Sequence, residues 1–144
     1  MATSEPAATR DPDALLASMS FSVACGVRLE AASPELVSGR LEWAPERCTA
    51  GGVLHGGALM TLADSVGAVC AFLNLPPGAG TSTIESKTNF FRAVRSGHVT
   101  AAARPVHVGR TTIVVQTDLR DADDRRVALV LQTQAVLTQP AGPG

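Results

Sequence analysis

Asp64 and His55 have side chains that could do chemistry, and they lie in a stretch with little other charge. Between Arg47 and Glu85 the chain contains no Lys, Arg or Glu, and these two are the only strongly ionisable side chains there. Asp64 belongs to a run that otherwise reads as an apolar helix. Because burying an unpaired charge costs several kcal/mol or shifts its pKa, we expect such a carboxylate to be bonded or used. Asp64 is therefore the first candidate for general-base or nucleophilic chemistry.

The composition limits what such a site could serve. The chain has 144 residues, 45% of them hydrophobic, which is enough for one sizeable core. Its net charge of -1 supplies no field to attract phosphate backbones or anionic membranes, and an aromatic content of 3% leaves few platforms for stacked bases. The sequence predicts one domain over 13–138, between a flexible arm at 1–12 and a flexible tail at 139–144, with no nucleic-acid or membrane partner.

The three cysteines give no sign of a metal site or a disulfide framework. Cys25, Cys48 and Cys70 are an odd number at spacings that match neither, and no apolar signal segment precedes them. This pattern indicates thiols in a reducing cytoplasm, so we expect a cytoplasmic protein without a bound metal. Cys48, close to His55, is an alternative nucleophile, although the sequence shows no electropositive niche that would activate its thiol.

Hydrophobic periodicity predicts an α+β fold. Apolar residues recur at three- and four-residue steps over 57–73, which indicates a helix that is apolar nearly all round and covered on most sides. A short helix is predicted over 13–20, and strands over 23–32, 36–44, 82–92, 97–108, 111–121 and 126–138. The short turns between successive strands make neighbours antiparallel. A curved antiparallel sheet wrapped around one long central helix satisfies this order.

Three ordered groups of residues carry a resemblance to a known family. They are Gly52-Val53-Leu54-His55-Gly56-Gly57 followed by Leu62-Ala63-Asp64, then Thr88-Asn89-Phe90-Phe91-Arg92 with Gly97-His98-Val99, and finally His107-Val108-Gly109-Arg110-Thr111-Thr112 with Asp118-Leu119-Arg120-Asp121. With them the chain resembles the hotdog-fold acyl-CoA thioesterases, in particular the phenylacetate-degradation type and one class of 4-hydroxybenzoyl-CoA thioesterase. The resemblance covers roughly residues 36–138. It implies the hotdog fold, hydrolysis of an acyl-CoA to free acid and CoA, and no cofactor, since coenzyme A is part of the substrate.

The resemblance assigns chemistry to residues near the start of the long helix. The backbone amide of Gly56 polarises the thioester carbonyl, at a helix N-terminus where free N–H groups favour developing negative charge. Asp64 is the catalytic carboxylate, either a general base on water or a nucleophile that forms an anhydride with the acyl group, and the sequence leaves both routes open. His55 is expected to orient the loop through its ring nitrogens.

Assistance to this pair is expected from hydroxyl groups. Thr49 stands where relatives carry Asn or Gln, and its hydroxyl can still donate and accept hydrogen bonds. One class of relatives carries a helping Thr four residues after the carboxylate, where this chain has Ala68. We therefore expect help from Thr83, although Ser82 beside it remains an alternative.

Coenzyme A is expected to meet Arg92, Arg110 and Thr111, which match positions that bind its nucleotide and phosphates in relatives. Arg forms forked, charge-assisted bonds to phosphate. Aromatic, medium-chain and long-chain acyl groups all remain alternatives for the acyl part of the substrate. Two other functions remain alternatives, a noncatalytic acyl-CoA sensor or binding module and a hotdog hydratase acting on an enoyl thioester.

The spacing of Gly56 and Asp64 adds a geometric inference. Asp64 follows Gly56 by eight residues, so at 1.5 Å per residue the two lie about 12 Å apart along the helix. One helix cannot present both to one small carbonyl group. We infer that Gly56 of one subunit faces Asp64 of another, in a homodimer with two-fold symmetry and two sites. A dimer of dimers, a homotetramer, is the expected larger assembly.

Overall fold

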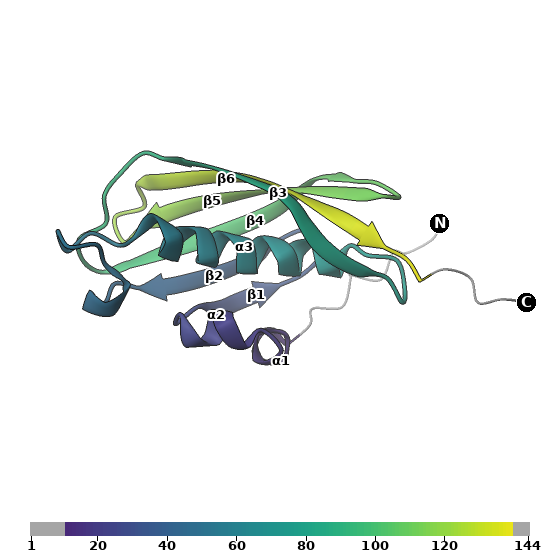
Figure 1. Ribbon diagram of the computed structural model, residues 1–144, viewed down its shortest axis with the longest axis horizontal. Helices are drawn as coiled ribbons and strands as arrows, with labels where there is room; N and C mark the ends of the chain where they lie inside the picture. The colour runs from purple at the N-terminus through teal and green to yellow at the C-terminus, as the bar shows by residue number, and fades with distance from the viewer. Residues whose placement is uncertain (1–10, 140–144) are drawn as a thin grey trace, which may run out of the picture.

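The computed structural model describes residues 11–139, and its central feature is an antiparallel sheet that curves around one long helix (Figure 1). The strands are β1 (Arg28–Ala32), β2 (Val37–Glu42), β3 (Gly80–Phe90), β4 (His98–Val108), β5 (Thr112–Asp121) and β6 (Arg126–Leu137), in the sheet order β1-β2-β4-β5-β6-β3. All neighbouring strands pair antiparallel. The predicted α+β hotdog architecture is confirmed. The predicted flexible arm and tail fall largely outside the described residues.

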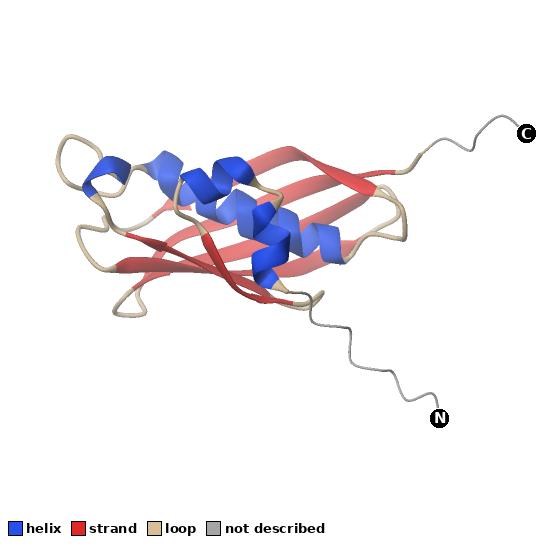
Figure 2. Cartoon of the chain, turned by 90° about the horizontal axis from the view of Figure 1, so that it is seen from below, coloured by secondary structure: helices blue, strands red, loops and turns tan. Residues whose placement is uncertain are grey.

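The helices are α1 (Pro12–Ala17), α2 (Ser20–Ala24), the single 3-10 turn η1 (Pro45–Arg47) and the long α3 (Gly56–Leu73). Figure 2 shows α3 lying across the concave face of the sheet, with the short helices on the same side. The strand predicted over 23–32 is wrong in its first half, because residues 20–24 form α2 and β1 begins only at Arg28. The sequence there, Ser-Phe-Ser-Val-Ala, has no helical repeat long enough to identify a helix this short.

Most of the core forms where α3 meets the sheet. Nine of its eighteen residues are buried, and they pack against inward-facing side chains of the strands. Among residues 11–139, α3 is the one helix long and apolar enough to cross a membrane, yet half of it is buried against its own sheet. A core helix of this kind is expected to be apolar nearly all round.

One face of α3 and the neighbouring edge of the sheet are left uncovered by the chain itself. Met60 is 40% exposed, and Asp64 is exposed as well. The expectation that α3 is covered on most sides therefore holds only for the side that faces the sheet. β3 is the last strand of the sheet and pairs only with β6. Ile84, which is 63% exposed, and Phe90, which is 49% exposed, lie on it. Such an edge carries unpaired backbone groups and is a template for pairing with another strand.

A bulge at Ile84 sets which residues of β3 face the helix. Thr83 lies opposite Gln134 of β6, but Glu85 lies opposite Thr133, so Ile84 is one extra residue without a partner. The bulge brings Ser86 opposite Gln132. Since directly opposed residues share a face of the sheet, Thr83 and Ser86 both point toward α3 although three positions separate them.

The short helix α2 is tied to α3 and to η1 by polar contacts. The hydroxyl groups of Ser22 and Ser65 lie 2.7 Å apart in a buried position. Arg47 donates from Nε to the carbonyl of Cys25 at 2.7 Å and from an η nitrogen to the carbonyl of Glu42 at 3.1 Å. Gly26 permits this clamp, because its φ is +87° and a Cβ there would overlap the Arg47 guanidinium. These bonds hold α2 over the first half of α3.

Candidate active site

One carboxylate oxygen of Asp64 accepts hydrogen bonds, and the other is free of them in the part of the chain that the structure describes. Its Oδ1 accepts a hydrogen bond from the Thr83 hydroxyl at 3.2 Å and another from the Gln132 side-chain amide. No donor from residues 11–139 reaches its Oδ2, and the side chain is exposed. Asp64 is therefore bonded at one oxygen, although its side chain is not buried as the apolar helix led us to expect. A carboxylate fixed through one oxygen, with the other free, can act on a water or on a carbonyl carbon.

A chain of polar side chains from β3 and β6 stands behind Asp64. Gln134 donates its amide to the Thr83 hydroxyl at 2.8 Å, and the Thr81 hydroxyl donates to Oε1 of Gln134 at 3.1 Å. Gln132 is fully buried and Gln134 is 1% exposed. Because the Thr83 hydroxyl accepts from Gln134, its own proton is directed to Asp64. Thr83, rather than Ser82, is thus the residue that the fold brings to the carboxylate.

Asp64 opens into a cavity of about 260 Å³ between α2, α3 and β3. It is lined by Asp64, Met60 and Thr61 of α3, by Phe21 and Ser22 of α2, and by Ser86 of β3. The cavity is therefore bounded by the face of α3 that its own sheet does not cover. Substrate atoms can approach the open oxygen of the carboxylate from this side.

His55 caps the start of α3 and leaves one amide free. Its Nδ1 accepts from the amide of Gly57 at 2.8 Å, so a neutral ring carries its proton on Nε2, and its own amide donates to the carbonyl of Arg47 at 2.9 Å. No acceptor within residues 11–139 faces the amide of Gly56. A Cβ on Gly56 would lie 3.2 Å from Cζ of Phe90. The predicted role of His55 in shaping this turn matches its contacts, and the free amide is the one the sequence singled out.

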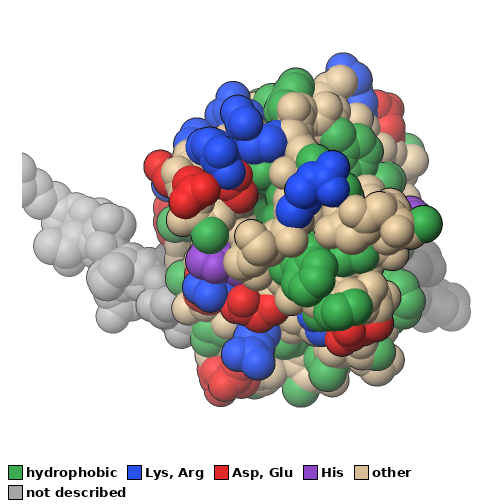
Figure 3. Space-filling view, turned by 90° about the vertical axis from the view of Figure 1, so that its left-hand side faces the viewer, with side chains coloured by type: hydrophobic (Ala, Val, Ile, Leu, Met, Phe, Trp, Pro, Cys, Tyr) green, Lys and Arg blue, Asp and Glu red, His purple; other side chains and the backbone are tan. Residues whose placement is uncertain are grey.

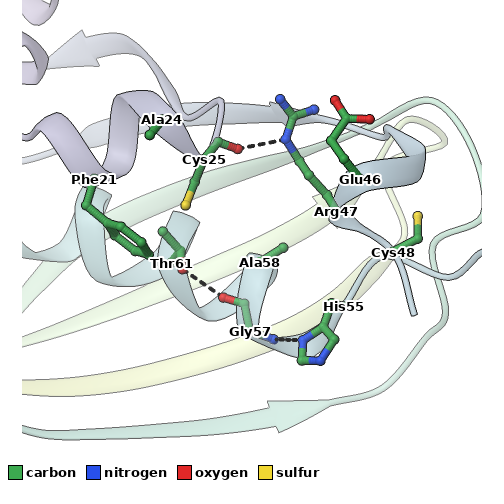
Figure 4. A pocket seen from close by; sticks show the side chains of 10 residues that line it. All are labelled: Phe21, Ala24, Cys25, Glu46, Arg47, Cys48, His55, Gly57, Ala58 and Thr61. Atoms are coloured by element: carbon green, nitrogen blue, oxygen red, sulfur yellow. Dashed lines mark hydrogen bonds between the residues drawn. The ribbon is translucent and has the colours of Figure 1, made fainter. Parts of the chain in front are cut away.

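A larger hollow of about 560 Å³ lies beside this helix start (Figure 4). Figure 4 shows Phe21 at the left of it, Arg47 bonded to the Cys25 carbonyl above, and Thr61 of α3 with His55 at the helix start below. Phe21 and Thr61 also line the cavity that contains Asp64. The two hollows therefore adjoin at α2.

Thr49 lies apart from Asp64 within the chain. It is exposed in the turn closed by the bridge between Cys48 and Leu54, where its amide donates to the carbonyl of Val53 at 2.8 Å. This turn lies just ahead of Gly56. The chain therefore places Thr49 with the helix start and not with the carboxylate.

The residues expected to bind coenzyme A lie at opposite ends of the sheet. Arg92 follows the end of β3, where Phe90 pairs with Ala128, whereas Arg110 and Thr111 occupy the turn between β4 and β5. The latter turn lies near the start of β3, since Thr111 accepts from the amide of Val136 at 2.9 Å. At about 3.3 Å per residue, the eleven residues of β3 place the two ends roughly 33 Å apart. The chain by itself does not bring these residues together.

Most of the ion pairs among residues 11–139 gather around the turn between β5 and β6. At the end of the molecule seen in Figure 3, basic and acidic side chains lie interspersed. Asp118 pairs with Arg126 at 2.7 Å and with Arg120 at 3.0 Å. Partial burial raises the pKa of Asp118, but the bonds from these two guanidinium groups outweigh it and hold the pKa below its ordinary value. Basic and acidic side chains thus lie next to each other around this turn.

The cysteines do not form a reactive centre. Burial raises the pKa of the Cys70 thiol to about 11, against a smaller opposing effect of Arg104. The Cys48 thiol donates to the carbonyl of Ala44 at 3.2 Å. Within the described part of the chain, no group of three or more His, Cys, Asp or Glu side chains is arranged to hold a metal ion.

Gln132 and Gln134 were missed in the sequence. A signal was present, because Gln132 and Gln134 continue the two-residue series of Ala128 and Val130. All four residues face inward on β6. Two amides in phase with buried apolar residues indicate a polar contact within the core. Here that contact is the support of Asp64.

Comparison with known proteins identifies relatives over most of the chain. A family model described as the thioesterase superfamily matches residues 51–128. A Pseudomonas aeruginosa protein named as an esterase is 33% identical over 132 residues, which cover 90% of this chain and 91% of that protein. The 1,4-dihydroxy-2-naphthoyl-CoA hydrolase of Escherichia coli is 33% identical over 86 residues, 60% of this chain and 63% of the relative.

Solved structures agree with these matches. A mutant thioesterase from Pseudomonas aeruginosa superposes with a TM-score of 0.86 at 32% identity, over 92% of this chain and 97% of that one. A thioesterase from Haemophilus influenzae gives a TM-score of 0.87 at 26% identity, over 95% and 97% of the two chains. With its hotdog fold and these relatives, the chain belongs to the thioesterase superfamily and is a thioester hydrolase.

Proposed function

We propose that the protein hydrolyses acyl-CoA thioesters to a free acid and CoA, with Asp64 as the catalytic carboxylate and the Gly56 amide as the donor to the thioester carbonyl. One observation carries the proposal: Asp64 is held through Oδ1 and presents its other oxygen to a cavity. The Escherichia coli relative, whose name is that of a CoA thioester hydrolase, supports coenzyme A as the thiol carrier.

Both chemical routes use this arrangement. In one, Asp64 takes a proton from a water that attacks the carbonyl carbon. In the other, Asp64 attacks the carbon itself, and water then cleaves the resulting anhydride. In each route the C–S bond breaks, the sulfur leaves as the CoA thiolate and is then protonated, and a donor aimed at the carbonyl oxygen stabilises its developing charge.

The donor and the carboxylate come from different subunits of a homodimer in this proposal. Along α3 they are about 12 Å apart, which is too far for one carbonyl group. They also lie beside different parts of β3, because Gly56 lies against Phe90 whereas Asp64 bonds Thr83. A second copy that turns the helix start toward the carboxylate resolves both separations.

The positions of these groups support one placement of the two-fold axis. For Gly56 to face Asp64 of the partner subunit, the axis must pass halfway between them, which is near Met60 on α3. The midpoint between Thr83 and Phe90 on β3 is near Ser86. Met60 and Ser86 line the same cavity, as expected where α3 and β3 lie side by side, so one axis can pass near both. The open edge of β3 would then pair with its own copy about Ser86.

The same symmetry operation gathers the groups expected to bind CoA. An antiparallel β3–β3 pairing places the end of one β3 beside the start of the other. Arg92 of one subunit would then lie at the same end as Arg110 and Thr111 of the partner subunit. The dimer would thereby bring together phosphate-binding residues that lie at opposite ends of the sheet in one chain. Thr49, which lies near Gly56, would likewise approach the partner's Asp64.

The test is hydrolysis of a panel of aromatic, medium-chain and long-chain acyl-CoAs, measured by the release of free thiol. Asp64→Asn keeps the side-chain volume and removes the base or nucleophile, so kcat should fall by about 10²- to 10⁴-fold with the fold intact. Glu30→Gln, at an exposed position of β1, is the matched control and should keep wild-type turnover. Undiminished hydrolysis by Asp64→Asn would remove Asp64 from the mechanism. Binding of every ester without turnover by the wild type would favour the sensor.

A further inference from the structure

We propose that Gln132 is a positioning residue for Asp64 and that Gly67 is the residue that makes room for it. This inference rests on the proposed catalytic role of Asp64. Gln132 lies on β6, is fully buried, and reaches across to α3, where its Nε2 donates to Oδ1 of Asp64. The same Nε2 lies 3.3 Å from the Thr83 hydroxyl. Gln132 therefore acts on the carboxylate without reaching the substrate cavity.

The far end of the Gln132 side chain shows that its orientation is set by Asp64. Its Oε1 is buried and has no hydrogen-bond partner among residues 11–139. Leaving a buried carbonyl unpaired costs free energy, so a side chain kept only to fill this space would be apolar. Rotating the amide by half a turn would place its oxygen against the carboxylate. The bond to Asp64 is thus the interaction that fixes the amide.

Gly67 completes the arrangement from the helix side. It is buried on α3, one turn after Asp64, and a Cβ at this position would lie 2.1 Å from Oε1 of Gln132. Any other residue here would force the amide out of place. Glycine weakens the interior of a helix, so its presence at the point of closest approach matches a requirement for space.

The helix itself offers Asp64 no such support. The residue four positions after Asp64 is Ala68, whose side chain has no donor. Both bonds to Oδ1 come from the sheet, one from Thr83 on β3 and one from Gln132 on β6. Two donors from two strands fix the carboxylate plane and direct Oδ2 to the cavity. Misplacing a reacting group by about 1 Å can cost about 10²-fold in rate.

The first test uses Gln132→Met, which keeps the length of the side chain and removes both polar atoms. We expect kcat to fall by about 10- to 100-fold while KM stays within about two-fold, because Gln132 does not touch substrate. Gln116→Met, at an exposed position of β5, is the matched control and should leave both constants unchanged. Thermal melting of each variant reports whether the fold is kept. An unchanged kcat, or a loss that appears mainly in KM, would overturn the proposal.

The second test is a double-mutant cycle with Gly67→Ala and Gln132→Ala. Gly67→Ala should lower kcat by displacing the amide, and Gln132→Ala should lower it by removing the amide. With Gln132→Ala in place the new methyl group has room, so the double variant should be no slower than Gln132→Ala alone. Losses that multiply would show that the two positions act independently and would refute the coupling. If Asp64→Asn is inactive while Gln132→Met has full kcat, positioning fails and the proposed function stands, whereas an active Asp64→Asn removes the proposed function.

Discussion

The ring of His55 accepts the amide hydrogen of Gly57 at 2.8 Å, one residue beyond the amide that the start of α3 leaves free. The cap thereby satisfies one of the N-terminal N–H groups of the helix and holds the turn. The neighbouring amide of Gly56 stays available to an oxygen from outside the chain. This division of the two glycine amides leads to a direct experiment.

Gly56→Pro should abolish most turnover, because proline has no N–H to offer the thioester carbonyl. The backbone accepts this change: Gly56 is the first residue of α3, and His55 before it already has φ -63° and ψ 137°, which suit a residue preceding proline. Gly56→Ala is the control, since it adds the Cβ that crowds Phe90 in both variants but keeps the N–H. We expect kcat to fall by about 10²- to 10³-fold for the proline variant and far less for the alanine variant. Equal losses would mean that crowding, not the amide, is responsible.

Mixing two inactive variants should restore activity if the site is shared. A heterodimer of Gly56→Pro and Asp64→Ala subunits has one site with both groups intact and one site with neither. At full subunit exchange in an equimolar mixture, about half of the dimers are mixed, so about a quarter of the wild-type kcat per site should return. The measurement is thiol release after co-refolding, with exchange confirmed by mass labelling. No recovery in an exchanged mixture would place both groups in the same subunit.

Ser86→Cys should form a covalent dimer under mild oxidation. If the two-fold axis passes beside Ser86, the two copies of this residue lie directly opposite each other on antiparallel strands, about 4.5–5.5 Å apart between Cα atoms. A disulfide accepts this separation. Non-reducing electrophoresis should show a dimer band for Ser86→Cys, and none for Glu30→Cys on β1 or for the natural chain with Cys25, Cys48 and Cys70. A band of equal strength from the β1 variant would contradict the proposed edge.

Asp118→Asn should destabilise the protein at neutral pH and do so less in acid. The pKa of Asp118 is held below its ordinary value in the folded chain, because the bonds from Arg126 and Arg120 outweigh the opposing effect of burial. A lowered folded pKa adds stability above the ordinary value of about 3.9 and loses it as the pH falls through the folded value. Urea unfolding at pH 7 should show a loss of about 1 kcal/mol that shrinks toward pH 3. Asp123→Asn, at an exposed position, is the control, and a loss independent of pH would point to packing instead.

Much of the fold could be predicted from the sequence because its signals are local. The periodicity of residues 57–73 located α3 to within one residue, and turn residues located β4, β5 and β6 to within one residue at each end. α2 could not be found this way. Its five residues are too few for a repeat, and tertiary bonds such as that from Arg47 to the Cys25 carbonyl hold it in place.

The candidate site could be predicted in part. Asp64, Gly56 and Thr83 were expected, and the structure places Thr83 on the carboxylate. Gln132 was not expected, because its bond joins positions 68 residues apart and only the sheet register reveals it. Short-range sequence patterns report helices and turns well but carry little information on such long-range polar contacts.

The extra residue at Ile84 gives the edge strand one position that it can lose. Deleting Ile84 would restore a regular ladder with β6, in which Thr83, Glu85 and Ser86 still lie opposite Gln134, Thr133 and Gln132. Thr83 and Ser86 would keep facing α3, because a single residue would then separate them. Losing one residue between Ser86 and Phe90 would instead turn every side chain on one side of the deletion to the other face. A missing codon would thus be harmless to this face at one position of β3 and disruptive a few positions later.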